Sequence, residues 1–331
     1  MGEQIRICTF NLENFDDRPD LKPTLAERIA IMRPQLIRSR ADILCLQEVN
    51  GQGEANHRTL SALDQLLDHT PYAAYQRIFT SMVNSAYPYE ERNLVTISRL
   101  PILQSENLRH SPQIAPSYRR VTAVPDEAEA KIVEWERPIL YAGTDLGSNR
   151  TLHLFNLHLK SKIPSNIPGQ KIDDYTWRTA SAWAEGCFIS TMKRLGQALQ
   201  LRRKVDELFT QAEGAGAPLY IAIVGDFNDE LDSVTLDAIR GPVEETGNPE
   251  LSGRVIVSCE MTIPKSSRYS LFHLGQGQMI DHILASRALM TYYQGAEIHN
   301  EILPDESGAF RTDVKFPESD HAPVVAVFLL P

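Results

Sequence analysis

Short apolar runs recur along the chain and alternate with segments of helical periodicity. Eight of these runs are rich in β-branched and aliphatic residues and are bounded by polar or turn-forming residues, a pattern typical of buried strands. The predicted strands are residues 5–10, 42–49, 93–99, 138–143, 151–159, 220–227, 279–286 and 323–330. Strands are therefore expected along the whole length of the chain.

Apolar residues at helical spacing predict three helices between these strands. Residues 24–39 carry such a face, interrupted only by Pro34, and residues 60–67 form a second candidate. Residues 175–212 form the longest, and two glycines within it leave open whether it is one helix or two. Because helices and strands are mixed along the chain, the pattern predicts an α/β protein.

Three further stretches, residues 105–138, 161–174 and 241–267, show neither period and are predicted to be long loops. Loops of this length in a compact domain are more often functional than idle. None of them coincides with a sharp change of composition. We therefore expect a single domain over residues 1–331.

The charge balance limits the class of substrate. The 331 residues carry a net charge of −10, which argues against a broad basic surface that grips long nucleic acid. A nuclease with its basic residues confined to one cleft stays compatible with this balance. No apolar run reaches the length that spans a membrane, and the first residues do not read as a secretory leader. We expect a cytoplasmic monomer without a membrane anchor.

The segment Tyr220–Glu230 begins like a buried strand and ends in polar residues. Gly225 is expected to let the strand turn tightly. Asp226 and Asn228 follow, and the alternation of side chains places Phe227 between them on the opposite, core-facing side.

Polar residues stand at the ends of other predicted strands as well. A single one would be explained as a turn former. Together they indicate that the strand ends converge on one edge of packed sheets and deliver their side chains to one cleft. The residues placed in this way are Asn11, Gln47, Glu48, Asn156, His158, Asp281, His282, Asp320 and His321. We expect His282 to face away from Asp281, and Gln47 to support Glu48 rather than bind a metal.

The types of these side chains indicate a chemistry. Carboxylates and amide oxygens without a cysteine partner suit Mg²⁺ or Mn²⁺ better than zinc. Mg²⁺ takes few protein ligands, so Asn11, Glu48 and Asp320 would suffice. A hard cation beside two imidazoles suits attack of water on a phosphate ester. Asn228 and a protonated His158 can stabilise the negative charge that develops.

Other motifs fit the same residues poorly. The segment from Asp226 to Asp237 begins like a calcium-binding loop, but Leu231 stands where that loop requires glycine. The sequence contains no glycine-rich phosphate loop and no Gly-x-Ser-x-Gly motif.

Seven short motifs, read in order, resemble the endonuclease/exonuclease/phosphatase superfamily of DNase I-like, metal-dependent enzymes. They are TFNLEN, ILCLQEV, LVTISRLPI, NLHLKS, GDFND, IDHILAS and SDHAPV, and they span nearly the whole chain. Some of them look most like the bacterial branch of nucleases and phosphodiesterases. The resemblance implies a four-layered α/β sandwich, in which two stacked, mainly antiparallel sheets are flanked by helices.

The resemblance also implies roles for individual residues. Metal ligands or close neighbours of the metal are implied at Asn11, Glu48 and Asp320. Catalytic residues are implied at His158, Asp226, Asn228, Asp281 and His321. Asp226 is similar to the residue that orients or deprotonates the attacking water, with Asn228 as its partner. His321, paired with Asp281, resembles the charged imidazole against the scissile phosphate, and His158 looks like the second histidine.

Three further residues are candidate contacts of the substrate, each with an ordinary structural alternative. Lys160 can bind phosphate or be a solvated surface lysine, and Asn93 can bind phosphate or shape a turn. Arg178 lies near a predicted loop, where an exposed helix face also explains it.

The sequence thus predicts a Mg²⁺- or Mn²⁺-dependent hydrolase of a phosphodiester, which can be DNA, RNA, a nucleotide or a smaller ester. A phosphomonoesterase, with residues 160–171 as its basic pocket, is the alternative within the enzyme class. A non-catalytic binding protein on the same fold is the alternative outside it.

Overall fold

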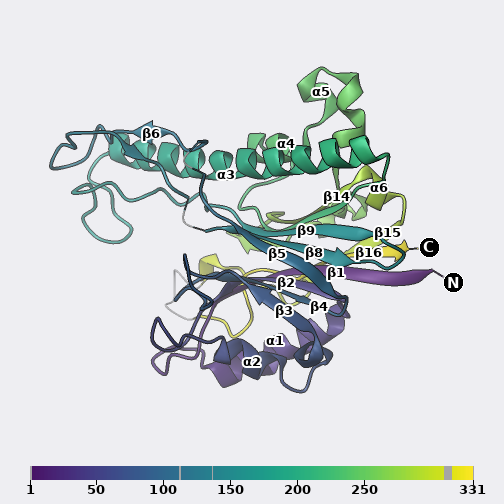
Figure 1. Cartoon of the computed structure of the whole chain (residues 1–331). Coiled ribbons are helices and arrows are strands. Elements are labelled where there is room, and N and C mark those ends of the chain that lie inside the picture. The colour runs from purple at the N-terminus through teal and green to yellow at the C-terminus, as the bar shows by residue number, and fades with distance from the viewer. Residues whose placement is uncertain (1, 112, 136, 309–314, 331) are drawn as a thin grey trace.

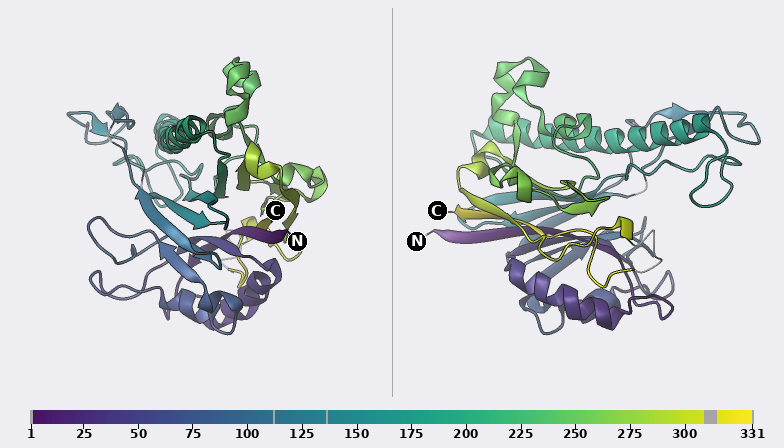
Figure 2. Two further views of the ribbon diagram at one scale, coloured as in Figure 1. Left: turned by 45° about the vertical axis from the view of Figure 1, so that its right-hand side comes forward. Right: turned by 180° about the vertical axis from the view of Figure 1, so that it is seen from behind.

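Two six-stranded sheets lie face to face, and helices cover the outer face of each, in a computed structural model that describes residues 2–111, 113–135, 137–308 and 315–330 (Figure 1). The four layers follow the order helix, sheet, sheet, helix, as the two turned views also show (Figure 2). The predicted four-layered sandwich is confirmed.

The first sheet has the strand order β15-β16-β1-β2-β4-β3. Its strands are β1 (Glu3–Phe15), β2 (Ile43–Val49), β3 (Gln76–Phe79), β4 (Asn93–Ser98), β15 (Tyr293–Ile298) and β16 (Val324–Leu330). The central strands β1 and β2 are parallel, and the other neighbouring pairs are antiparallel.

The second sheet has the order β11-β14-β10-β9-β8-β5 and repeats this arrangement. Its strands are β5 (Ile102–Leu108), β8 (Ile139–Asp145), β9 (Thr151–His158), β10 (Tyr220–Asp226), β11 (Ile256–Ser258) and β14 (Asp281–Ser286). Again only the central pair, β9 and β10, is parallel among these strands. Two short hairpins complete the strands: β6 (Ser117–Tyr118) with β7 (Lys131–Ile132), and β12 (Leu271–His273) with β13 (Gln276–Gln278).

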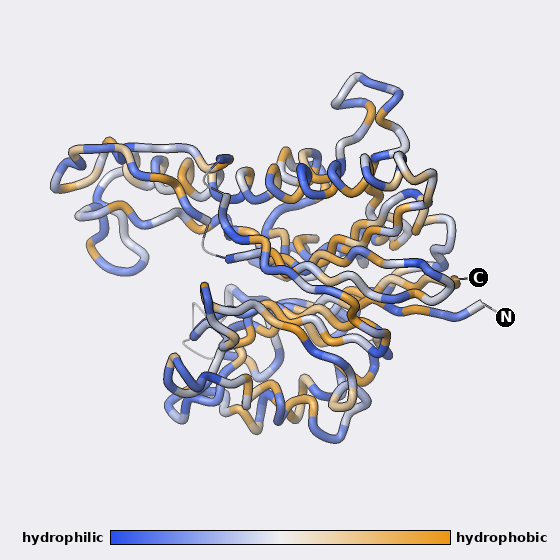
Figure 3. The backbone as a smooth tube through the Cα atoms, in the orientation of Figure 1, coloured by the Kyte–Doolittle hydropathy of each residue, from blue (hydrophilic) through white to orange (hydrophobic). Residues whose placement is uncertain are grey.

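Alternating side chains build three apolar layers. In β1, Ile5 and Ile7 pack between the sheets, whereas Cys8 and Phe10 pack under the outer helices. Strand β10 follows the same rule, because Ala222 and Val224 face the other sheet while its alternate residues face the opposite helices. Figure 3 shows the apolar residues concentrated along the strands and the polar ones in the loops.

Of the six described helices, the three that come first in the chain correspond to predicted helices, and the other three were not predicted. The helices are α1 (Leu25–Ser39), α2 (Ser61–Leu67), α3 (Ala180–Ala215), α4 (Val234–Arg240), α5 (Val243–Thr246) and α6 (Arg287–Met290), with four 3₁₀ turns, η1 (Pro71–Ala74), η2 (Pro249–Arg254), η3 (Glu260–Thr262) and η4 (Lys265–Ser267). Helix α1 continues through Pro34. No helix in the described part of the chain is both long and apolar enough to cross a bilayer.

Helix α3 is one helix of 36 residues, and it begins later than the apolar pattern predicted. Lys171 and Trp177 pair across a β-bridge, which holds residues 171–177 in a turn, so the helix starts only after the Thr179 cap. Its N-terminal half extends beyond the sheets, beside the segments that surround β6 (Figure 1). We call residues 113–135 and 160–196 the arm.

The predicted loops hold more structure than the sequence suggested. Residues 105–108 continue β5, and the rest of that first stretch contains the β6–β7 hairpin. The stretch 241–267 contains α5, three 3₁₀ turns and β11. These strands and turns are two to six residues long, too short for a sequence period to reveal them.

Candidate active site

The carboxyl ends of the two parallel pairs meet at the same end of the sandwich. In the second sheet, Asp226 of β10 lies beside His158 of β9 and opposite Asp281 of β14. Asp226 continues the row of Ala222 and Val224, which face the other sheet, and Asn11 continues the corresponding row of β1. Strand alternation therefore directs carboxylate, imidazole and amide groups toward one place between the sheets.

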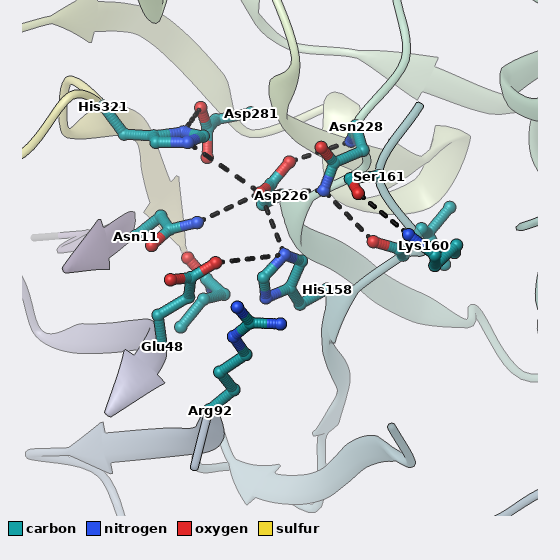
Figure 4. A network of polar contacts seen from close by, with 12 residues as sticks. Asn11, Glu48, Arg92, His158, Lys160, Ser161, Asp226, Asn228, Asp281 and His321 are labelled. Carbon is teal, nitrogen blue, oxygen red and sulfur yellow. Dashed lines mark hydrogen bonds and ion pairs between the residues drawn. The ribbon is translucent and has the colours of Figure 1, made fainter. Parts of the chain in front are cut away.

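Asp226 lies at the centre of this group, as Figure 4 shows. Its Oδ2 accepts hydrogen bonds of 3.0 Å from the side-chain amides of Asn11 and Asn228, and its Oδ1 accepts one of 2.8 Å from the Asn228 backbone N–H. Nε2 of His158 lies 3.2 Å from the same Oδ2, and Nε2 of His321 lies 4.0 Å from it. With 1 % of its surface exposed, Asp226 is oriented by donors from both sheets.

Glu48 reaches the site through an irregular backbone. Its φ of 57° lies in the left-handed region, and the pairing of β2 with β4 shifts register between Leu46 and Val49. Strict alternation would turn Glu48 toward the outer helices, as it does for Leu46. In this conformation Oε1 of Glu48 lies 3.6 Å from Nε2 of His158, and Oε2 accepts a bond of 2.9 Å from the Asn14 N–H.

His321 is held by a carboxylate of the other sheet. Its Nδ1 lies 2.7 Å from Oδ2 of Asp281, and its backbone N–H donates to Oγ of Ser319 at 3.1 Å. Ser319 in turn donates to the backbone carbonyl of Asn11 at 2.7 Å. These bonds fix the ring so that Nε2 points toward Asp226 (Figure 4).

Burial and neighbouring charges shift the pKa values of His321 and His158 in opposite directions. Although burial works against the charged ring, the carboxylates of Asp281 and Asp320 raise the pKa of His321 well above its usual range. Burial, together with the positive charge of Arg137, lowers the pKa of His158 well below its usual range. Burial next to Asp281 raises the pKa of Asp226 to about 7. Near neutral pH the site therefore holds a charged His321, a neutral His158 and a carboxylate able to exchange a proton.

The residues predicted to bind a metal present oxygen atoms that fit a hard cation. Oδ1 of Asp320 is buried and has no hydrogen-bond partner within the described residues. Burial also raises the pKa of Asp320 well above its usual range, as expected of a carboxyl that lacks a compensating cation. Among the described residues, possible ligand atoms of Asp226, Asp281 and His321 lie within 4.8 Å of one another. Within that group Asp281 already binds His321. In the set expected from the sequence, Oδ1 of Asn11 accepts a hydrogen bond of 2.9 Å from the Glu13 N–H, and Oδ1 of Asp320 is the buried oxygen without such a partner.

A cleft of about 1030 Å³ opens over these residues. It is lined by Glu48, His158, Asp226, Asn228, Asp320 and His321, and by five cations, Arg92, Arg137, Lys160, Lys162 and Lys315. An acidic centre surrounded by cations suits a phosphate ester that approaches a bound metal ion.

Several residues that line this cleft were not predicted from the sequence. Arg92 directly precedes β4, and its guanidinium lies below His158 (Figure 4). Glu13 lies in a left-handed stretch near the end of β1 and accepts a bond of 3.3 Å from the Asp320 N–H. The position of Arg92 could have been inferred from the sequence. It precedes β4, and the start of β4 lies beside the end of its antiparallel partner β2, where Glu48 stands.

Of the three candidate substrate contacts, only Lys160 lines the cleft. Asn93 is fully buried and donates to the carbonyls of Val49 and Tyr89 at 2.9 and 2.8 Å, so it shapes the turn before β4. Arg178 is exposed just before the cap of α3 and does not line the cleft. Asn93 thus has the turn-shaping role that was its structural alternative, and Arg178 has the exposed position that was its own.

Of two expectations about the end of β10, the structure agrees with the one for Phe227 and differs from the one for Gly225. Phe227 packs in the cluster between the second sheet and the outer helices, as alternation predicted. Gly225, in contrast, does not end the strand, which continues to Asp226. Its φ is 142°, and a Cβ atom there would lie 2.0 Å from the carbonyl oxygen of Leu157. Glycine is needed for the close approach of β9 rather than for a turn.

Gln47 and His282 support the site from behind. Gln47 donates to Oδ1 of Asn156 at 2.8 Å and to Thr9 at 3.0 Å, which links the two sheets below Glu48. His282 faces away from the cleft as expected, bonds to Glu260 and lies 2.9 Å from the carbonyl oxygen of Asp229.

Comparison with known proteins places these observations in a family. A family model described as the endonuclease/exonuclease/phosphatase family matches residues 8–321. Truncated Caenorhabditis elegans TDP2 is 15% identical, with a TM-score of 0.56 over 98% of both chains. An AP endonuclease from Archaeoglobus fulgidus is 17% identical, with a TM-score of 0.51 over 98% of this chain and 99% of that chain.

A mannosyl-6-phosphatase from Bacteroides thetaiotaomicron is 16% identical, with a TM-score of 0.55 over 97% of this chain and 98% of that chain. Among curated protein sequences, none matches this chain. At these identities the solved structures show the fold, and the resemblance found in the sequence motifs is confirmed.

Proposed function

Since this chain belongs to the endonuclease/exonuclease/phosphatase family, we propose that it hydrolyses phosphodiester bonds by direct attack of water, with Mg²⁺ or Mn²⁺ as cofactor. The observation that carries the proposal is the position of Asp226, whose carboxylate is oriented by two amides and lies 3.2 and 4.0 Å from the Nε2 atoms of two histidines. Residues 1–331 would act as one catalytic domain, because both sheets supply parts of this site.

Asp226 is the proposed general base. Asn11 and Asn228 fix its carboxylate, and a pKa of about 7 matches the optimum for proton transfer near neutral pH. As the oxygen of water forms its bond to phosphorus, the proton of that water passes to Asp226. The bond from phosphorus to the ester oxygen breaks, and the departing alkoxide takes up a proton from solvent and leaves as the alcohol.

His321 is the proposed electrophilic residue. Asp281 holds Nδ1, so Nε2 of the charged ring is available to donate to a non-bridging oxygen of the phosphate. A donor fixed in this way strengthens its interaction as negative charge grows on that oxygen. His158, kept neutral, donates from Nε2 toward Asp226 and keeps that carboxylate aligned.

Glu48, Asn11 and Asp320 would hold the cation. When bound, a divalent ion supplies neutralisation of the phosphoryl oxygens and of the leaving oxygen. The cations at the walls of the cleft would attract the phosphate before this happens. Of these, Lys160 is fixed by donating to Oγ of Ser161 at 3.0 Å and to the carbonyl of Ile163 at 3.2 Å.

Phosphomonoesterase activity is the second candidate, because five cations line the cleft and could hold a dianionic phosphate. The name of the Bacteroides neighbour, a mannosyl-6-phosphatase, is compatible with it. Parallel assays with bis(p-nitrophenyl) phosphate and p-nitrophenyl phosphate separate the two. The proposal expects the diester to be the better substrate, and preference for the monoester would replace it by the second candidate.

A further inference from the structure

A second cavity of about 510 Å³ adjoins the catalytic cleft, and Lys160 lines both. Of the described residues around this second cavity, one is acidic, Glu134, and four are basic: Arg120, Lys131, Lys160 and Lys193. The cavity lies on the arm, between the β6–β7 hairpin and α3. Arg120 and Lys131 both pair with Glu127, so a chain of anionic groups that leaves the cleft past Lys160 would meet Lys193 and these two paired cations.

The arm differs in charge from the rest of the chain. Its residues 113–135 and 160–196 include 9 Lys and Arg and 7 Asp and Glu, whereas the whole chain has a net charge of −10. The arm thus has a small positive surplus while the remainder of the chain is acidic, a difference that favours binding of a polyanion on the arm.

An aromatic side chain, Tyr175, lies where the arm borders the catalytic cleft. Tyr175 lines the catalytic cleft and is 80% exposed. Its turn is fixed, because the backbone N–H groups of Tyr175 and Thr176 donate to Oδ1 of Asp173 at 2.9 and 2.8 Å. The Lys171 ammonium lies 4.9 Å from the centre of the Trp177 ring, which braces the same turn. An exposed ring on a braced turn is suited to stacking on a base.

The arm is attached firmly to the active site. Arg194 of α3 donates to the backbone carbonyls of Lys160 and Ser161 at 3.0 and 3.3 Å and to Asp229 at 3.2 Å. On the outer side, Glu185 of α3 accepts bonds of 2.9 Å from the Tyr118 hydroxyl and from the backbone of Thr122. The second cavity is thus held in a fixed position relative to the cleft.

We propose that the arm binds a single-stranded nucleic acid, with one base stacked on Tyr175 and the phosphates beyond the scissile one bound in the second cavity. The proposal rests on the proposed function in placing the scissile phosphate beside His321. Cations in two successive cavities match repeated phosphates, whereas a lipid headgroup presents its phosphate at one position. In a duplex each base is stacked between its neighbours and cannot stack on Tyr175. The site therefore favours a single strand, whose bases are free to do so.

Binding of a fluorescein-labelled single-stranded 12-mer to the full chain, measured by anisotropy, tests the proposal. The Asp226→Asn variant serves as background, so that the strand is not cut during the measurement. We expect Tyr175→Ser and Lys193→Ala each to weaken binding about tenfold, and Tyr175→Phe to retain it. Lys204→Ala is the matched control, because Lys204 lies on the same helix and lines neither cavity.

Equal losses for Lys193→Ala and Lys204→Ala would overturn the proposal. So would failure to bind the 12-mer together with binding to phosphatidylserine vesicles, which would assign the arm to a membrane surface instead. The failure of the proposed function is distinct: wild-type protein would then cut neither aryl phosphodiester nor 12-mer, while the binding pattern of the variants would persist. Cleavage of the aryl diester without binding of the strand would refute the inference alone.

Discussion

Oδ2 of Asp281 and Nδ1 of His321 form a buried hydrogen bond of 2.7 Å that joins the two sheets beneath the catalytic cleft. Asp281 begins β14 in one sheet, and His321 lies just before β16 of the other. Neither sheet alone could hold the ring, so the packing of the sheets itself fixes the direction of Nε2. The predictions below depend on this arrangement.

Replacing Asp281 by Asn should lower the pKa of His321, because the neutral amide no longer stabilises the imidazolium. We expect kcat/KM for an aryl phosphodiester to fall about 10²-fold, as for loss of one fixed donor. Steady-state kinetics and NMR titration of the His321 ring measure both effects. Asp237→Asn, on the outer helix α4, is the control and should change neither. Full activity in Asp281→Asn would remove His321 from the mechanism.

The pH dependence of kcat/KM should be bell-shaped. A pKa of about 7 means that Asp226 is an effective base only above that value, so activity rises as the pH increases through about 7. His321 must keep its proton, and its raised pKa places the descending limb at higher pH. A profile of kcat/KM between pH 5 and 10 checks this. Activity that is highest at pH 5 would contradict the assignment of Asp226 as base.

Much of the site could be predicted because strand alternation is a strict rule. The rule separates Asp226 from Phe227 and Asp281 from His282, and the structure follows it in both cases. Glu48 breaks the rule, since its left-handed backbone turns the side chain toward the cleft. In that case the position of the residue at the end of a predicted strand, and not the alternation, identified it.

Other features could not be predicted from the sequence, because they depend on tertiary contacts. Glycine is required at position 225 because the backbone of Leu157 in the neighbouring strand comes so close to it. No local sequence pattern indicates this contact between strands. Asn93 and Arg178 were offered as substrate contacts from their sequence positions alone. Burial of the first and the direction of the second depend on loops whose conformation follows from tertiary contacts.

Removing one carboxylate of the proposed metal set should raise the metal requirement. Glu48→Gln keeps the size of the side chain but loses its charge, so we expect at least about tenfold more Mg²⁺ to be needed for half-maximal activity. Isothermal titration calorimetry should show a matching loss of Mg²⁺ affinity. Glu106→Gln, an exposed change on β5, is the control. An unchanged Mg²⁺ requirement would place the metal elsewhere.

The close approach of β9 to β10 should make Gly225→Ala strongly destabilising. A Cβ atom 2.0 Å from the Leu157 carbonyl forces the strands apart, and we expect the free energy of unfolding to fall by about 3 kcal/mol. Urea denaturation measures this. Gly214→Ala is the matched control, since nothing lies within 4 Å of its added Cβ and alanine favours the helix by up to about 1 kcal/mol. Equal stability of the two variants would contradict the described packing.

The central claim is that Asp226 activates water for metal-dependent attack on a phosphodiester. It is tested most directly by the rate of bis(p-nitrophenyl) phosphate hydrolysis in wild-type protein and in Asp226→Asn, with chelator and after Mg²⁺ is restored. We expect wild-type activity to vanish with chelator and to return with Mg²⁺, and the variant to be about 10²- to 10⁴-fold slower than wild type when Mg²⁺ is present. Hydrolysis that survives both the chelator and the substitution would contradict the account.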